Sequence, residues 1–473
     1  MKVTQVSVCP TEAAQAAGRP ALTPELLAAS GARYSRSNEG LDAILAKIDP
    51  TNLDRSVESI FRMIDYGHQS IADMVPVAMF IDGISIWLAY HLWSIAPTAG
   101  GQESSTRYIR LAVEGLVPPE TLGLPEENAG LWREFMETAF DHYLQSLTMW
   151  EEIAIAVPGA SRIPQSVLSD ETEAGRRKLA RMQRNYAFDR ARYFLPVAAR
   201  TNVMLIMSAR AWVQLCQNLL AHPLPEANEL GRAIRNELEL VAPRMCRHAA
   251  LKASMAAGLL AEFQRLQHLA ACSRSQYLEN DTADCTHPPS ATLTITPSPN
   301  AQPDFPGDLS FHENRYAWIG PDLRRTAVRF AWEAVALAEI RDLNRHRTGN
   351  KHCPLLPQGF YCAKDEIPTS DLLSQGWLER LAALSDFGRD ISRLAHDKLA
   401  DGDPTYVYWT LLGTQYPFEH LTTADKFIYE AELRTGIGAH FRYADHLRET
   451  LRLWYDAYPE TRGLILEGSA EPE

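Results

Sequence analysis

The sequence has no CxxC pair, and its seven cysteines form an odd set. They stand at positions 9, 216, 246, 272, 285, 353 and 362. Because an odd set cannot close completely into disulfides, a small secreted fold held by a disulfide framework is excluded. We expect a protein of a reducing compartment, the cytoplasm, whose cysteines pack as small apolar residues.

Positive charge is also in short supply. The chain has 46 Lys and Arg residues against 59 Asp and Glu residues, so its formal net charge is -13. Long-range repulsion from a phosphate backbone or an anionic membrane surface argues against nucleic acid or membrane partners. A small anionic ligand stays possible, because a few arginines that converge in one pocket set the local potential.

Uninterrupted hydrophobic runs of membrane-spanning length are missing as well. The apolar segment 74–96 could suggest a membrane helix, but Pro76, Asp82, Gly83 and His91 interrupt it. VAMFID followed by ISIWLAYHLW predicts a buried strand, a turn and a core helix instead. The opening MKVTQVSVCPTEAAQ lacks the basic and apolar stretches of a signal peptide, so we expect a soluble protein.

Helical periodicity, by contrast, is abundant. With 473 residues, 46% of them hydrophobic, the chain can build two domains of ordinary size. Residues 23–269 are predicted to be mostly helical, with Thr23 as a cap before Pro24. Prolines cluster in residues 285–308, around the strand-like TLTIT, and separate this part from a second helix-rich half. We predict a first domain over 1–270 and a second over 271–473.

The two halves contain the same parts in the same order, which predicts an internal duplication. In each half a strand leads into an apolar helix, ISIWLAYHLW in one and AVALAEIRDLNRHR in the other. Later, each half has a hydrophobic segment that begins near a proline and is followed by a final helix. These segments are RYFLPVAARTNVMLIMSARAWVQL and YWTLLGTQYPFEHLTTADKFIYEAEL.

Six short strings carry a family resemblance. The first half contains GARYSRS, YGHQSIAD, GGQESSTRYIRL and DRARYFLP, and the second contains RHRTGNK and ELRTGIGAHFRYADHLRETL. In this order they resemble the motifs of the flavin-dependent thymidylate synthases, the ThyX family. The resemblance implies a helix-rich α+β fold made of two tandem ThyX-like domains, each a small antiparallel sheet packed with long helices.

The resemblance also implies roles for individual residues. A flavin would be held by Arg345, His346 and Arg347, and by four residues of the first half, Ser35, His68, Ser70 and Glu103. Deoxyuridylate (dUMP) would be held by Gln102, Ser105, Arg107, Tyr108 and Arg434. The candidate catalytic groups are Arg434, as an electrostatic group, and Ser105, as a positioning hydroxyl. Arginine suits these anionic ligands because its planar fork is permanently charged.

The implied activity is thymidylate synthesis. FAD and NADPH would supply the reducing hydride, and methylenetetrahydrofolate the one-carbon group transferred to dUMP. The family builds each site from several copies of its fold in a tetramer, and the two halves of this chain have lost complementary motifs. The RHR position of the first half reads Leu92, Trp93 and Ser94, and the second half reads HCPLLPQGFY where the first keeps ESSTRY. A homodimer of this duplicated chain would therefore mimic the tetramer.

Each of these motifs also has an ordinary structural explanation that involves no ligand. RHR could be a solvated cationic helix end, STRY an ordinary turn, and His68 the end of a helix. A set of charges, Arg434, Arg442 and Arg448 with Glu430, Glu432 and Asp445, could form an exposed helical face. A metal site from His346, His352, Cys353 and Cys362 matches no standard ligand spacing, so none is expected. Five tryptophans are expected in the core: Trp87, Trp93, Trp212, Trp332 and Trp409.

One departure from the family pattern concerns activity. A glutamine usually stands three residues before the RHR triplet, and here the position is Asp342. A carboxylate near a bound nucleotide is unfavourable unless it is paired, for which Arg341 or Arg345 are candidates. The alternative function is therefore an inactive ThyX-like paralogue that binds nucleotide or flavin, or an enzyme acting on a different pyrimidine.

Overall fold

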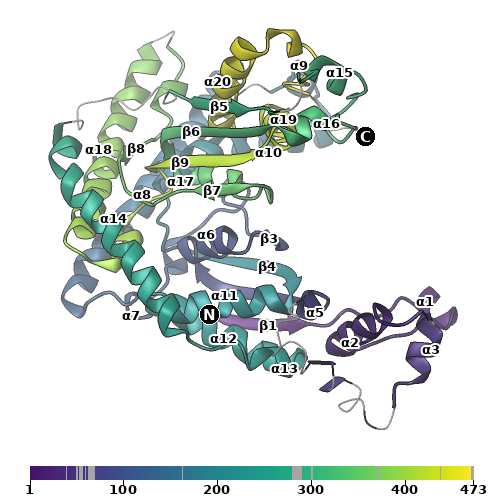
Figure 1. Cartoon of the computed structure of the whole chain (residues 1–473). Coiled ribbons are helices and arrows are strands. Elements are labelled where there is room, and N and C mark those ends of the chain that lie inside the picture. Colours follow the sequence, from purple (N-terminus) through teal and green to yellow (C-terminus); the bar gives the residue numbers. More distant parts are fainter. Residues whose placement is uncertain are drawn as a thin grey trace. The chain divides into compact units, whose positions relative to one another are not determined.

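The structure is a computed structural model (Figure 1), in which the chain forms two compact units. The first comprises Met1–Ser104, Leu116–Pro125 and Ala199–Gln264, and the second Ser105–Gly115, Glu126–Ala198 and Arg265–Glu473. The structure describes residues 1–38, 40–49, 52, 57–58, 60–61, 70–161, 163–279, 290–299, 302–369, 372–436 and 438–469.

The first unit contains a four-stranded antiparallel sheet in the order β1-β2-β4-β3. Its strands are β1 (Lys2–Val6), β2 (Pro76–Ser85), β3 (Gly100–Glu103) and β4 (Arg200–Ser208). Its helices are α1 (Glu12–Ala16), α2 (Pro24–Tyr34), α3 (Leu41–Ala46), α5 (Ser70–Asp73), α6 (Ile86–Ile95), α7 (Pro119–Leu122), α11 (Ala209–Ala221), α12 (Pro225–Val241), α13 (Pro243–Cys246) and the first part of α14 (Ala253–Glu279).

The second unit contains a sheet in the order β5-β6-β9-β7, with β8 paired to β9. Its strands are β5 (Thr292–Thr296), β6 (Ala327–Ala336), β7 (Asn350–His352), β8 (Gly359–Phe360) and β9 (Thr414–Thr423). Its α-helices are α8 (Glu126–Ala156), α9 (Gln165–Leu168), α10 (Glu173–Ala191), α15 (Phe305–Leu309), α16 (Pro321–Arg325), α17 (Leu337–Leu343), α18 (Leu372–Ala400), α19 (Ala424–Thr435) and α20 (Phe441–Ala457). Its described residues also include the 3-10 turns η1 (Val113–Gly115), η2 (Arg192–Phe194), η4 (Lys364–Glu366), η5 (Pro404–Trp409) and η6 (Pro459–Thr461).

The predicted strand and core helix in 74–96 are confirmed as β2 and α6. Alternate residues of β2, including Val77, Met79 and Ile81, are buried, as one covered sheet face requires. The strand passes directly into the helix at Ser85, whose hydroxyl accepts a hydrogen bond from the Leu88 amide and so caps the helix. The short TLTIT strand is confirmed as β5.

The duplication is confirmed by the sheet topology, because the two strand orders are the same when β1 to β4 are matched with β5, β6, β7 and β9. β2 and β6 each have ten residues, carry a register shift in the second half of the strand and run into a helix. β4 and β9 likewise end where α11 and α19 begin. Matching the ends of β2 and β6 sets Ser85 against Ala336. On that register the RHR triplet corresponds to Ser94, Ile95 and Ala96. The alignment with Leu92–Ser94 stays a prediction.

Equivalent positions of the two copies also meet inside the second unit. Pro196 pairs with Leu411 in an antiparallel bridge, and both lie just before the matched strands β4 and β9. On either side, the Leu412 amide donates to the Leu195 carbonyl and the Val197 amide donates to the Thr410 carbonyl. Such reciprocal bonds between equivalent residues are the pattern of a two-fold contact between two copies.

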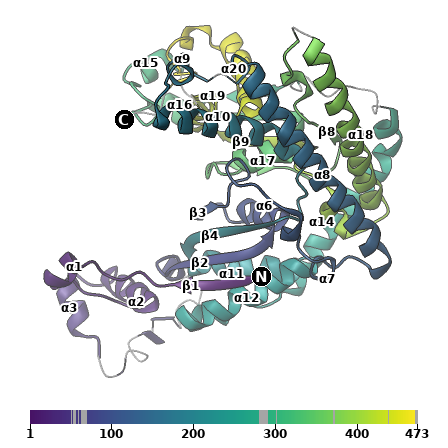
Figure 2. The same cartoon turned by 180° about the vertical axis from the view of Figure 1, so that it is seen from behind.

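The compact units do not follow the order of the chain. Residues 126–198 precede β4 in sequence but pack in the second unit, where α8 lies against α10 and α18 (Figure 2). The Trp132 indole donates to the Tyr408 carbonyl at 2.8 Å, and Phe135 contacts the Trp409 ring. A first domain of 1–270 is therefore not a compact unit. Domains 1–270 and 271–473 stay a prediction for the extents of the two copies.

Candidate functional site

The RHR triplet follows α17, a helix whose residues are all buried. The chain then turns at Gly349, which has φ of +70°. A Cβ added there would lie 2.1 Å from the Leu421 carbonyl oxygen. Both the backbone angle and the close approach favour glycine at this position, so the turn after Arg347 is fixed by the sequence.

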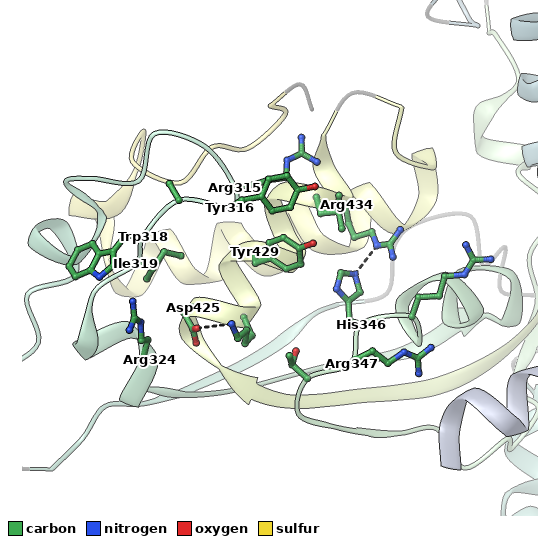
Figure 3. Close-up of a pocket in the computed structure, with 15 residues that line it drawn as sticks. Arg315, Tyr316, Trp318, Ile319, Arg324, His346, Arg347, Asp425, Tyr429 and Arg434 are labelled. Carbon is green, nitrogen blue, oxygen red and sulfur yellow. Dashed lines mark hydrogen bonds and ion pairs between the residues drawn. The ribbon is translucent and has the colours of Figure 1, made fainter. Parts of the chain in front are cut away.

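A cavity of about 850 Å³ lies beside this turn (Figure 3). Figure 3 shows Trp318 and Arg324 toward one end, the Tyr316 and Tyr429 rings between, and Arg434 and His346 toward the other end. Its lining is Arg315, Tyr316, Ala317, Trp318, Ile319, Arg324, Arg345, His346, Arg347, Thr348, Asp425, Lys426, Tyr429, Leu433 and Arg434. Cationic side chains far outnumber Asp425 in this set, so the cavity is suited to an anionic ligand.

Arg434 has a defined position in this cavity. Its Nε donates to His346 Nε2 at 2.8 Å, and its Nη2 donates to the Asp342 carbonyl at 2.9 Å. Burial lowers the pKa of His346 to about 3, against the opposing charge of Glu430. With this pKa the His346 imidazole is neutral at pH 7, so its Nε2 can accept the hydrogen bond from Arg434. The two bonds fix the plane of the guanidinium, which therefore is not a mobile surface side chain.

The other two guanidinium groups leave an excess of positive charge. Burial, followed by the charge of Arg345, lowers the pKa of Arg347 to about 10. Arg347 is still cationic at neutral pH, and the direction of its pKa shift reflects desolvation and like-charge repulsion. A bound anion would relieve both, so the triplet is electrostatically prepared for an anionic ligand.

Asp342 is buried and is neutralised mainly by an arginine distant in sequence. Both terminal nitrogens of Arg192 lie 3.2 Å from Asp342 Oδ2, whereas Arg345 Nε lies 4.0 Å from Oδ1. Burial acts to raise the pKa of Asp342, but the charges of Arg192 and Arg345, with smaller effects of Arg107 and Arg434, lower it. The predicted pairing with Arg345 is thus supplemented by Arg192, while Arg341 Nη1 lies 3.5 Å from the Thr106 hydroxyl.

The STRY segment forms a turn that places Arg107 over a second cavity, of about 560 Å³. The Ser105 hydroxyl accepts a hydrogen bond from the Arg107 amide at 3.2 Å. Arg107 makes two hydrogen bonds to Asp189, of 2.6 and 2.8 Å, and approaches the Gly438 carbonyl at 3.5 Å. Arg107 and Tyr108 line this second cavity, whereas Arg434 lines the first.

The two cavities adjoin at the end of α19. Arg434 borders the first, and the next residues, Thr435 and Gly436, border the second. The charges of Arg107 and Arg434 both lower the pKa of Asp342. Cationic groups from both sequence halves therefore gather around one buried carboxylate, although they open into neighbouring cavities.

Four of the predicted ligand-binding residues that the structure describes belong to the first unit. Ser35 ends α2 and its hydroxyl donates to the Ala32 carbonyl, and Ser70 is exposed at the start of α5. Gln102 is exposed on β3, while buried Glu103 accepts a hydrogen bond from the Trp93 indole at 3.1 Å. His68 lies outside the residues that the structure describes.

The charged residues of α19 and α20 could have formed an exposed helical face, but this interpretation is wrong for most of them. Buried Arg442 pairs with Asp365 at 3.0 Å, Glu432 with His312 at 2.9 Å, and Glu430 with His420 at 3.0 Å. These charges face partners in the core because helices α19 and α20 pack on each other and on the sheet. Only Arg448 and Asp445 form the surface pair that was considered. The five tryptophans expected in the core are all buried, as predicted.

Sequence reasoning missed one wall of the first cavity: Arg315, Tyr316, Trp318, Arg324, Lys426 and Tyr429. Arg324 lies 5.8 Å from the centre of the Trp318 ring, and the Tyr316 and Tyr429 rings are 6.0 Å apart. The string ENRYAW, with two aromatic residues beside an arginine and after the proline-rich stretch, was the available signal.

The described part of the chain also bears on two other kinds of site, metal centres and membrane spans. Among these residues, no group of three or more His, Cys, Asp or Glu side chains is arranged to hold a metal ion. Within the same residues, every helix is too short or too polar to cross a bilayer.

Comparisons with known proteins agree with the motifs. The sequence model of the family described as thymidylate synthase complementing protein matches residues 21–244. UPF0159 protein Ta1429 of Thermoplasma acidophilum is 25% identical over 225 residues, 44% of this chain and 45% of that protein. This chain thus spans less than half the length of that relative.

Among solved structures, a UMP/dUMP methylase, PolB from Streptomyces cacaoi bound with 5-Br dUMP, aligns with a TM-score of 0.32 at 14% identity. The alignment covers 52% of this chain and 93% of the other. The family match includes the segments that hold Ser35, Ser70 and the STRY turn, and ends before the RHR triplet. Residues 21–244 therefore match the thymidylate synthase complementing protein family, in agreement with the resemblance of the motifs to the flavin-dependent thymidylate synthases.

Proposed function

We propose that the protein is a flavin-dependent thymidylate synthase-type enzyme that transfers a one-carbon group from methylenetetrahydrofolate to dUMP. FAD and NADPH would provide the reducing equivalents. The observation that carries the proposal is the cavity around Arg345, His346, Arg347 and Arg434. It combines the family's cationic motif with an excess of positive charge.

The first cavity fits a flavin dinucleotide in its chemistry. Its volume of about 850 Å³ lies within the range of small-molecule sites. The arginines suit a diphosphate, and Tyr316, Trp318 and Tyr429 offer aromatic faces to planar rings. Arg345, His346 and Arg347 would hold the cofactor, with Ser35, His68, Ser70 and Glu103 as the proposed helpers. A flavin held there would supply the redox chemistry of the one-carbon transfer.

The chain's own part in the reaction is to bind and orient. Arg434, with its plane fixed by His346 and the Asp342 carbonyl, would stabilise negative charge on the pyrimidine. Arg107 and Tyr108, with Gln102, would hold the dUMP phosphate and sugar. Ser105 would act by shaping the turn that presents Arg107, because its hydroxyl accepts the Arg107 amide.

Purified protein tests the proposal directly. We expect a yellow preparation whose FAD is reduced by NADPH and reoxidised when methylenetetrahydrofolate and dUMP are added. Arg434→Ala should lower the turnover of dUMP at least tenfold, the usual effect of removing one preorganised charge donor. Arg452→Ala is the matched control, because Arg452 pairs with Glu449 and Asp456 on the surface and lines neither cavity, so it should leave turnover unchanged.

Complementation of a thymidine-requiring bacterium tests the reaction in cells. Growth without thymidine is expected for the natural chain, and loss of growth for Arg345→Ala and Arg434→Ala. If both variants supported growth as well as the natural chain, the assignment of the site would be wrong even with the reaction correct.

One observation favours the second candidate, an inactive paralogue that binds flavin or nucleotide. Arg107 is already held by Asp189 through two short hydrogen bonds, so a nucleotide phosphate would have to compete with a carboxylate. On this alternative the protein binds FAD or dUMP in a calorimeter but shows no turnover of dUMP. A different pyrimidine substrate would instead show turnover with that nucleotide in place of dUMP.

We also propose that the protein is a homodimer. On the first unit's sheet, Phe80 and Ile206 are 43% and 46% exposed. Val6 lies in the same row as Ile206 and on the same face as both, because Ala78, two residues before Phe80, pairs with Val6 and with Ile206. An apolar sheet face of this kind favours contact with another protein surface. Light scattering should give twice the 52.9 kDa of one chain, and Ile206→Glu should reduce it to a single chain mass.

A further inference from the structure

A cationic groove lies along one face of α10, apart from the first cavity. Four side chains of this helix, Arg177, Lys178, Arg181 and Arg184, line a depression of about 710 Å³. The other lining residues are Tyr108, Ala174, Asn185 and Phe188. None of these lining residues is acidic, although the whole chain carries a net charge of -13.

The positions of the cations match one face of a helix. Spacings of three and four residues place Arg177, Arg181 and Arg184 along a single stripe. With a rise of about 1.5 Å per residue, the stripe from Arg177 to Arg184 is about 10 Å long. The opposite side of α10 packs on α8, where Tyr186 meets the Trp150 ring. The groove therefore offers a row of charges rather than a point charge.

This row has no evident role in the stability of the fold. Like charges three and four residues apart on a helix repel one another. Arg177 has an ion pair with Glu173, but both side chains are highly exposed, and such surface pairs contribute little. A ligand with several negative charges would offset the repulsion among these cations and would be attracted to them.

The groove continues into the cavity that contains Arg107. Tyr108 and Asn185 line both spaces. The Tyr108 side chain is 60% exposed, and the Arg107 guanidinium lies 5.8 Å from the centre of its ring. An aromatic ring exposed between two anion-binding regions is a suitable stacking surface for a planar ligand.

We propose that this groove binds the oligoanionic chain of an elongated small molecule whose planar ring lies on Tyr108, at the mouth of the Arg107 cavity. The chain is an oligophosphate or an oligocarboxylate, since both present several anionic oxygens to a row of guanidinium groups. The inference does not depend on the flavin site, because none of the eight lining residues belongs to the first cavity.

Direct binding to the full chain tests the groove, with calorimetry at low and moderate salt. The probes are inorganic tripolyphosphate, penta-γ-glutamate, and ATP as a probe that adds a ring to a triphosphate. At least one of the first two is expected to bind, and the one that binds identifies the chemistry of the chain. Binding should weaken at higher salt, as for other partly exposed charge contacts. If neither bound, the proposal would be overturned.

Matched variants localise the binding. Arg181→Glu should weaken it about tenfold, as expected for losing one charge-assisted contact. Arg181→Gln, which keeps a polar side chain, should weaken it less. Arg176→Glu makes the same charge change at an exposed position of α10 that does not line the groove, and should change the affinity by less than about twofold. Equal losses in Arg181→Glu and Arg176→Glu would indicate general surface electrostatics and overturn the site.

The ring subsite has its own readout. ATP should bind more tightly than tripolyphosphate, and Tyr108→Leu should remove that difference while leaving tripolyphosphate binding unchanged. Base stacking on an aromatic side chain accounts for the expected several-fold gain. If ATP and tripolyphosphate bound equally to the natural chain, the assignment of Tyr108 as a stacking surface would be wrong. Neither result depends on turnover of dUMP, so failure here is distinct from failure of the proposed reaction.

Discussion

The two copies of the fold share a topology but bury different side chains where their last strand passes into a helix, β4 into α11 and β9 into α19. When the ends of β4 and β9 are aligned, two buried polar residues of the second copy, His420 and Glu430, correspond to two buried leucines of the first. These are Leu205 and Leu215. Arg434 corresponds to Leu219, which is fully buried. The first copy therefore has hydrocarbon where the second has a polar network beside a cavity.

This difference supports the placement of the proposed ligand site in the second copy. Replacing a buried ion pair by hydrophobic residues is often neutral or stabilising, so a buried pair is weak evidence for stability. The first copy demonstrates that the fold forms with leucines at these positions. The buried charges of the second copy are therefore consistent with the anionic ligand that we propose for the adjacent cavity.

The largest effect should come from placing the second copy's arginine in the first. Leu219→Arg would bury a cation in a site closed by α12, where a Cβ added at Gly231 would lie 3.0 Å from the Leu219 Cβ. We expect a loss of about 5 kcal/mol or more in the free energy of unfolding, enough to prevent folding of a marginally stable unit. Thermal melts and the yield of soluble protein measure it.

Gln214→Arg is the control for this substitution, because Gln214 is exposed on the same helix. It should leave the melting temperature within about 2 °C of the natural value. If Leu219→Arg melted like the control, the first copy would have room for the cation, and burial would not explain its absence.

A second test converts the second copy toward the first. Glu430→Leu leaves His420 buried with its Nδ1 facing a leucine in place of a carboxylate at 3.0 Å, and should cost about 3 to 5 kcal/mol. The double variant with His420→Leu reproduces the first copy's pair and should recover much of that loss. Urea unfolding of the two single variants and the double variant completes a double-mutant cycle. A double variant less stable than Glu430→Leu would contradict the comparison.

The same elements show which structural features could be predicted from the sequence. Local patterns predicted β2 and α6, the TLTIT strand and the repeat, because alternation, apolar periodicity and caps are properties of neighbouring residues. They could not predict that Arg192 pairs with Asp342, since the two are 150 residues apart and meet only after packing. Nor could they predict that α8 packs against both α10 and α18.

The site was predictable to the extent that a motif names its residues. RHR and ELRT indicated the cationic side of the first cavity, and Arg434 does contact His346. The aromatic wall with Trp318 comes from a loop that precedes β6, which no periodicity places near α19. The engagement of Arg107 by Asp189 was likewise invisible, because a motif gives residue types and not their hydrogen-bond partners.

The smallest expected effect concerns Glu339, whose counterpart in the first copy is the buried Leu88. Burial raises the pKa of Glu339 to about 7 from 4.5, against the charge of Arg192. The Tyr193 hydroxyl donates to one of its oxygens at 2.7 Å. A carboxyl that binds its proton more tightly when folded favours the folded state at low pH, so stability should fall as pH rises from about 4.5 through about 7.

The loss over that range should be at most about 3 kcal/mol, since each pKa unit corresponds to about 1.4 kcal/mol. Glu339→Gln keeps the shape and a hydrogen-bonding oxygen but removes the proton equilibrium. Chemical unfolding at pH 5 and at pH 7.5 should therefore show a smaller difference for the variant than for the natural chain. Equal pH dependence in the two proteins would mean that Glu339 stays ionised when buried. The buried polar network of the second copy would then contain one more negative charge, which would offset part of the positive charge of its arginines.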